Sequence, residues 1–176
     1  LDEKGFTPGN GDTLIYQWDF GNCNDTIIYT NYAGVPWDQD VTYTYTEPGV
    51  YIVSMSATSL CGTSQDTDTV SVFPNPIINA FTTNACFGNF NEFNSNTSAQ
   101  TASTRTYTCS DTTFIVEVPA GNNIFSYQWS MQNGIDGTYM PGYDNTHPNP
   151  QFTFYNCGIK NISLTVTDEN GCSSVW

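Results

Sequence analysis

Apolar and polar residues alternate along much of the chain, most regularly over residues 41–57, VTYTYTEPGVYIVSMSA. A period of two is typical of a β-strand with one buried face. Pro48 and Gly49 interrupt the run, and this pair predicts a turn because Pro fixes φ and Gly accepts positive φ. After the turn the apolar set changes phase once and continues through Val50, Ile52 and Met55, or through Val53 and Ala57. The pattern therefore predicts two strands joined by a turn.

Further turn signals divide the chain after this region. Gly62 predicts a hairpin, and Val70 and Val72 alternate with Thr and Ser in the strand that follows. Pro74-Asn75-Pro76 breaks the sheet ladder, since Pro has no backbone N–H, and predicts a short stiff linker.

Two landmarks of the first half return in the second half in the same order. YQWDFGN begins at Tyr16 and YQWSMQNG begins at Tyr127. The segment 152–176, FTFYNCGIKNISLTVTDENGCSSVW, aligns with the segment 43–67, YTYTEPGVYIVSMSATSLCGTSQDT. Because both landmarks keep nearly the same spacing, the sequence predicts an internal repeat.

The repeat predicts two domains, at residues 1–74 and 77–176. The first has too few residues before its Trp strand and is expected to be incomplete at its N-terminal end. The second is expected to be incomplete at its C-terminal end. Residues 99–122 have no counterpart in the first copy, and TTFIVEV within them predicts an added strand in a surface insertion.

Composition supports an all-β chain and excludes several functions. Thr, Ser and Asn dominate the polar residues, whereas Lys, Arg and Glu, which usually cover helices, are scarce. Three Lys and Arg stand against 17 Asp and Glu, for a net charge of −14. Phosphate binding needs clustered basic residues, so the charge excludes a nucleic-acid partner and disfavours anionic membranes. No apolar run approaches the roughly 20 residues of a membrane span, so no membrane insertion is expected.

The six cysteines favour an oxidising, extracytoplasmic location. The sequence contains no Cys-x-x-Cys pair and one histidine, His147, so a structural zinc site is not expected.

The first copy resembles the polycystic kidney disease (PKD) domain, whose pattern is Trp-Asp-Phe-Gly-Asp-Gly, then His-Thr-Tyr, then Pro-Gly-x-Tyr-x-Val. YQWDFGN, YTYTEPGVYIVSMSAT and DTVSV carry the resemblance, although Asn22 replaces an Asp. The second copy departs further, with Ser130-Met131 for Asp-Phe and Cys157-Gly158 for Pro-Gly. The resemblance implies two tandem immunoglobulin-like β-sandwiches joined by the Pro-containing linker. It places Trp18, Trp129, Tyr45 and Phe154 in the cores.

The segments ACFGNFNEFNSNTS and LTVTDENGCSS are similar to repeats in giant surface proteins of Bacteroidota, of which SprB-like gliding-motility adhesins are one class. The resemblance implies a non-catalytic, adhesive segment of a secreted filament on the bacterial cell surface, with type IX secretion. Neighbouring repeats, surface polysaccharide and other filament subunits are the expected partners. The alternative is an accessory PKD spacer or carbohydrate-binding module of a secreted hydrolase.

In such a sandwich the first strand starts at the end where the last hairpin turns, which predicts a Cys86–Cys172 disulfide. Cys109 is expected to reach Cys157 if the insertion follows the sandwich edge. Cys23 and Cys61 have no assigned partners, and Cys23–Cys109 and Cys23–Cys61 both stay open. A Cys23–Cys61 bridge conflicts with geometry, because a whole strand separates the two cysteines, whereas bridged Cα atoms lie within about 7 Å.

Several residues are candidates for binding or modification, and none for catalysis. His147 lies in a Pro/Asn-rich loop without a nucleophile pattern, and no cofactor is expected apart from calcium. Oxygen ligands for calcium are offered by Asp12, Asp38 and Asp40. Aromatic residues that could stack on sugar rings are Trp37, Tyr139 and Tyr143. The Bacteroidota resemblance implies O-glycan attachment after Asp, at Thr13, Thr26, Thr69 and Thr112.

Overall fold

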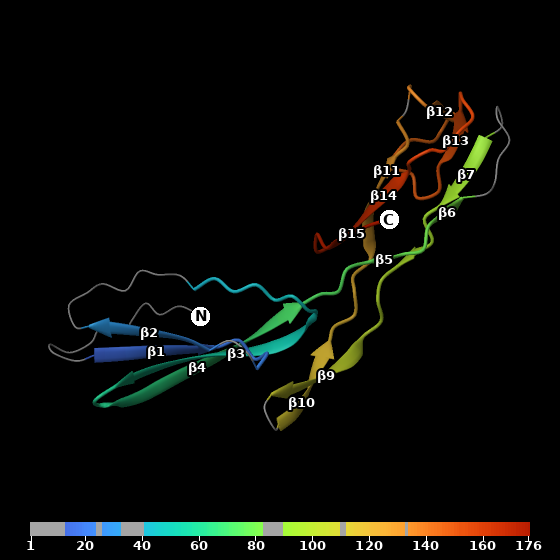
Figure 1. Ribbon diagram of the computed structural model, residues 1–176. Coiled ribbons are helices and arrows are strands. Elements are labelled where there is room, and N and C mark those ends of the chain that lie inside the picture. The colour runs from blue at the N-terminus through green and yellow to red at the C-terminus, as the bar shows by residue number, and fades with distance from the viewer. Residues whose placement is uncertain (1–12, 24–25, 33–40, 83–89, 110–111, 133) are drawn as a thin grey trace. The chain divides into compact units, whose positions relative to one another are not determined.

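The computed structural model describes residues 13–23, 26–32, 41–82, 90–109, 112–132 and 134–176. Every regular element in these ranges is a β-strand (Figure 1). The described residues contain no helix of the length and apolarity needed to cross a membrane. The predicted all-β class is confirmed.

The chain forms two compact units. The first contains residues 1–72 and 103–119, and the second contains residues 73–102 and 120–176. The segment 103–119 lies inside the insertion that the sequence pattern places in the second domain. In the structure this segment groups with the first unit, because its apolar side chains pack there.

The first unit has a four-stranded antiparallel sheet in the order β2-β1-β3-β4. Its strands are β1 (Thr13–Asp19), β2 (Thr26–Tyr32), β3 (Gly49–Ser59) and β4 (Gly62–Val72). Alternate side chains of β1 and β3 are buried on one face, namely those of Leu14, Tyr16, Trp18, Tyr51, Val53, Met55 and Ala57. Val41, Tyr43 and Tyr45 pack against this face, whereas Ile52 on the opposite face is 65% exposed.

Strand β4 ends the described sheet and is exposed along almost its whole length. Two of its carboxylates bond to their own strand. Asp66 Oδ1 accepts the backbone N–H of Thr67 at 2.9 Å, and Asp68 Oδ1 accepts that of Thr69 at 2.7 Å. These two amides are therefore satisfied within β4 itself.

The second unit is a β-sandwich. One sheet has the order β12-β13-β7-β6, another has the order β11-β14-β15, and β5 pairs with β8. The strands are β5 (Ile77–Ile78), β6 (Phe81–Thr82), β7 (Phe90–Asn94), β8 (Thr97–Ser98), β11 (Ile124–Ser130), β12 (Gly137–Tyr139), β13 (Gln151–Phe154), β14 (Ser163–Asp168) and β15 (Ser173–Val175). Side chains from both larger sheets meet in one buried cluster that includes Phe93, Trp129, Phe152, Leu164 and Val166. This is the layer arrangement of an immunoglobulin-like fold.

Both Trp strands pair with their neighbour in the same register. Trp18 lies opposite Met55, and Trp129 lies opposite Leu164. The sequence alignment of the two copies equates Met55 with Leu164, so the pairing agrees with the repeat. Trp18 and Trp129 are 6% and 2% exposed.

A hairpin made of β9 (Ser103–Cys109) and β10 (Thr112–Val118) packs against β3 in the first unit. Val116 and Val118 are buried, whereas Ile115 between them is 69% exposed. A Cβ on Gly49 would lie 2.8 Å from Val116 Cγ1, which leaves no room for a side chain. The hairpin therefore contributes apolar side chains to the core of the first unit.

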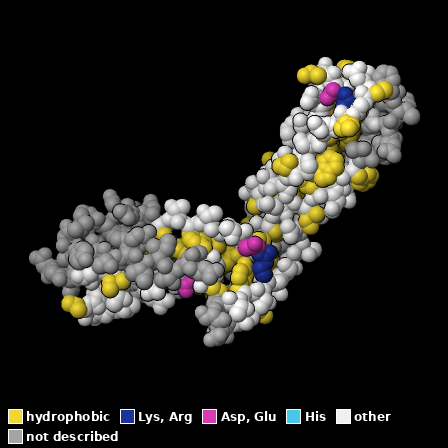
Figure 2. Space-filling model, viewed as in Figure 1, with side chains coloured by type: hydrophobic (Ala, Val, Ile, Leu, Met, Phe, Trp, Pro, Cys, Tyr) yellow, Lys and Arg dark blue, Asp and Glu magenta, His cyan; other side chains and the backbone are white. Residues whose placement is uncertain are grey.

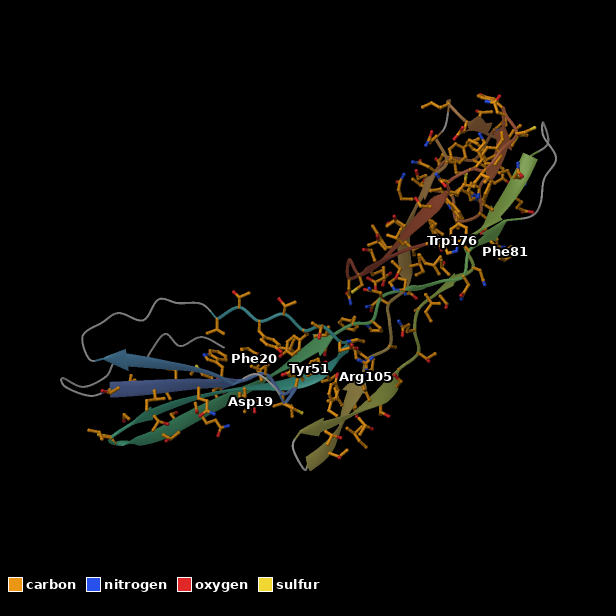
Figure 3. The ribbon with its side chains drawn as sticks, in the orientation of Figure 1. Asp19, Phe20, Tyr51, Phe81, Arg105 and Trp176 are labelled. Atoms are coloured by element: carbon orange, nitrogen blue, oxygen red, sulfur yellow. The ribbon has the colours of Figure 1, made fainter. Side chains whose placement is uncertain are left out.

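Polar groups complete this contact. Tyr51 Oη donates a hydrogen bond to the carbonyl of Glu47 at 2.9 Å and lies 3.3 Å from Tyr107 Oη. Arg105 of β9 forms an ion pair with Glu47. Figure 3 shows Arg105 beside Tyr51. Burial, and next the hydrogen bond with Tyr107, raise the pKa of Tyr51 above its ordinary value.

We expect Val116→Ala to destabilise the first unit by about 2 kcal/mol, because two buried methyl groups are lost. The matched change Ile115→Ala, one position away on the exposed side, should leave stability nearly unchanged. Hydrogen exchange of the β3 amides measures opening of this unit. Equal effects of the two substitutions would contradict the packing of β10 against β3.

The raised pKa of Tyr51 predicts a loss of stability at alkaline pH. The neutral phenol favours the folded state fully below the unfolded pKa of about 10, and this contribution disappears as the pH rises toward the folded value. Tyr51→Phe should therefore reduce the fall in unfolding free energy above about pH 10, measured by urea titration. The exposed Tyr155 gives the control, since Tyr155→Phe should preserve that fall. An unchanged fall in the Tyr51 variant would contradict the prediction.

Candidate functional site

The Trp-Asp-Phe-Gly-Asn segment of the first unit forms a tight structural loop. Asp19 Oδ1 accepts the N–H of Gly21 at 2.8 Å. Gly21 has a φ of +73°, and a Cβ there would lie 2.5 Å from the carbonyl oxygen of Ile52. Only glycine fits this close approach of the backbone to β3. The motif therefore has a structural role, because it forms the turn that ends β1 and lets the backbone approach β3.

Aromatic rings continue from this loop along the buried face of the sheet. The rings of Phe20 and Tyr43 stack at 4.1 Å, and those of Tyr45 and Tyr51 stack at 4.3 Å. Tyr45 Oη donates to the carbonyl of Phe20, and Asn22 Nδ2 donates to Tyr43 Oη. Burial is the largest cause that raises the pKa of Tyr45, so its hydroxyl stays a donor. The hydroxyl groups of Tyr43 and Tyr45 therefore form hydrogen bonds within the first unit.

Basic side chains are few on the face shown in Figure 2, and each visible one lies beside an acidic one. The described basic residues form the ion pairs Arg105–Glu47 and Lys160–Asp136, the latter at 2.8 Å. Most acidic residues therefore have no basic partner, and the described surface is strongly negative.

A pocket of about 440 Å³ lies in the second unit. It is bounded by strands β11, β12 and β14 and by the loop after β12. Its lining residues are mostly polar: Gln128, Trp129, Ser130, Met131, Gln132, Tyr139, Asp144, Asn145, Ser163 and Thr165.

Four of these polar side chains share one face of the β11–β14 pair. Gln128 lies opposite Thr165, and Ser130 lies opposite Ser163, with the buried Trp129 and its partner pointing to the other side. None of the four side chains hydrogen-bonds to another residue within the described ranges. Their donors and acceptors are available to a ligand.

The loop after β12 is fixed to the sandwich by hydrogen bonds. Trp129 N donates to the carbonyl of Asn145 at 2.7 Å, and Trp129 Nε1 donates to the carbonyl of His147 at 3.1 Å. At the end of the loop, Asn149 Oδ1 accepts the N–H of Ser95 at 3.1 Å. The buried indole thus holds the wall of the pocket as well as the core.

Asp144 supplies a fixed negative charge to this wall. Its Oδ1 accepts hydrogen bonds from Thr146 Oγ1 at 2.7 Å and from Thr146 N at 2.8 Å. These bonds lower the pKa of Asp144, so the carboxyl group is ionised at neutral pH. Burial, with a smaller effect of Asp144, raises the pKa of Tyr139. The pocket combines one carboxylate with a neutral phenol.

The cysteine predictions require correction. Cys61, Cys157 and Cys172 are free thiols, and Cys23 is disulfide-bonded. The predicted pairs Cys86–Cys172 and Cys109–Cys157 are therefore not formed. Cys157 lies exposed in the loop after β13, and the Cys172 thiol instead contacts the carbonyl oxygen of Phe73 at 4.0 Å. Burial, and then the charge of Asp168, raise the pKa of Cys172.

Several candidate residues lie outside the residues that the structure describes. For others, only the backbone is described. They are Asp12, Asp38 and Asp40 of the calcium proposal, Trp37, Cys86, and the side chains of Thr26, Cys109 and Thr112. Within the described part of the chain, no three His, Cys, Asp or Glu residues are grouped as metal ligands.

The other candidates are placed as follows. Thr13 is half-buried at the start of β1, and Thr69 is exposed on β4. Tyr45 and Phe154 are half-buried beside the cores. Tyr139 lines the pocket, whereas the Tyr143 ring packs edge-on against His147 at 4.7 Å.

Sequence reasoning missed the polar members of the pocket. Gln128 and Ser130 alternate with the buried Trp129, and Ser163 and Thr165 alternate with the buried Leu164. This alternation indicated the outer face of two strands. It carried no signal that the loop at Asp144 would close over them.

Comparison with known proteins gives a match for the first copy. No curated protein matches the chain. Residues 1–73 match the family model of the PKD domain. PKD domains are typically non-catalytic immunoglobulin-like modules and usually occur in extracellular or surface proteins. The match supports PKD-type repeats in this chain.

Proposed function

We propose that this chain is a non-catalytic, adhesive segment of a large secreted filament on a bacterial cell surface. The PKD match over residues 1–73 is the observation that carries the proposal, because this domain suggests a structural or adhesive extracellular repeat. The shared register of Trp18 and Trp129 supports a repeated unit. The filament we propose is a SprB-like gliding-motility adhesin of Bacteroidota.

The chemistry of the surface fits this role. The net charge of −14 keeps long arrays solvated and separated from one another. Tandem units that each bury their own aromatic core add length one unit at a time. The proposed partners are neighbouring repeats of the same polypeptide, other filament subunits and surface polysaccharide.

Immunogold labelling of intact, unpermeabilised source cells tests this proposal, with antibodies raised against residues 1–176. We expect label on filaments at the cell surface, and we expect deletion of the encoding gene to abolish both the label and spreading over agar. Label only in the culture medium, together with a hydrolase activity that copurifies with the antigen, would contradict the adhesin and favour an accessory module of a secreted enzyme.

A further inference from the structure

We propose that the pocket between β11, β14 and the loop at Asp144 binds a neutral saccharide. The volume of about 440 Å³ lies within the range of about 300–1,000 Å³ that is usual for small-molecule sites. The proposal rests on the adhesive role for its biological setting, but its chemistry comes from the pocket alone.

The lining has the composition that a polyhydroxylated ligand needs. Gln128, Ser130, Ser163 and Thr165 present both donors and acceptors, and none is spent on another described side chain or backbone group. A sugar ring offers hydroxyl groups that donate and accept at many positions. Tyr139 adds a half-buried ring against which an apolar pyranose face can pack.

Asp144 provides the strongest single acceptor. Thr146 occupies its Oδ1 twice, which fixes the orientation of the carboxylate. The backbone N–H of His147 also contacts this carboxylate, and the exposed group keeps further acceptor sites for ligand hydroxyls. Hydrogen bonds to an ionised acceptor are about twice as strong as neutral ones.

The charge of the molecule selects the class of saccharide. Asp144 is the only charged residue among the described residues that line the pocket, and the whole chain carries a net charge of −14. Uronic acids and sulfated sugars would be repelled by this field, whereas neutral hexoses and N-acetylhexosamines would not.

The site is largely formed before a ligand arrives. The loop wall is held by the two hydrogen bonds from Trp129, and the floor is a regular antiparallel strand pair. Little conformational entropy is therefore lost on binding, which favours recognition of a small polar ligand.

Titration of the ¹⁵N-labelled chain, residues 1–176, tests the proposal by NMR. The probes are maltotriose, cellotriose, mannotriose and diacetylchitobiose, each added to about 20 mM so that millimolar affinities are detected. We expect at least one probe to shift the amides of Gln128, Ser130, Asn145 and Thr165. Absence of shifts with all four probes would overturn the proposal.

Three variants localise the effect. Thr165→Trp fills the pocket and should abolish the shifts. Asp144→Asn keeps the size of the side chain and the bonds from Thr146, and it should weaken binding about tenfold because a charged acceptor is lost. The matched control Glu169→Gln removes the same charge from the exposed turn after β14 and should bind like the parent chain. Amide dispersion in each spectrum verifies that the variant is folded.

Two outcomes besides absence of binding would overturn the inference. Shifts that persist in the Thr165→Trp variant would place the ligand elsewhere. Binding of polygalacturonate at these amides in preference to the neutral probes would contradict the charge argument. Neither result bears on the surface location of the protein, which is tested on cells.

Discussion

The burial of one indole ring against the neighbouring strand organises each unit. Trp18 faces Met55 and Trp129 faces Leu164, so the widest side chain of the core meets a flexible or branched aliphatic one in both places. A ring of this size removes a large apolar area from water, which is the main favourable term in folding. Once the ring is inside, the phase of its own strand and of the partner strand is fixed, because a shift by one residue would expose it.

In the second unit the same ring also controls the surface. Trp129 donates through both its backbone and its indole nitrogen to the loop that carries Asp144. Core packing and the geometry of the pocket are thereby joined in one residue. A substitution that lost only the indole N–H would remove one of these two bonds and leave the backbone bond to Asn145 in place.

The local pattern of the sequence predicted the strands, the hairpin at Gly62, the repeat and the extra strand within residues 99–122. The sequence did not determine which alternate residues after Gly49 face the core. In the structure Val53 and Ala57 are buried on the side of the Trp18 ring, whereas Ile52 points to the opposite, exposed face. The position of Val116 beside Gly49 could not be predicted, because residues so far apart in sequence share no local periodicity. The cysteine pairs were wrong as well, because a sequence alone does not determine which cysteines of distant segments meet.

In β4, aspartate carboxylates accept hydrogen bonds from backbone N–H groups of the same strand, and this affects how copies of the chain meet at high concentration. An exposed strand at the end of a sheet invites pairing with a strand from another molecule, which is a common route to aggregation. In β4, Asp66 and Asp68 occupy the amides of Thr67 and Thr69 and add negative charge along the same line. Copies of the chain at high concentration would thus lie edge to edge without fusing into a shared sheet.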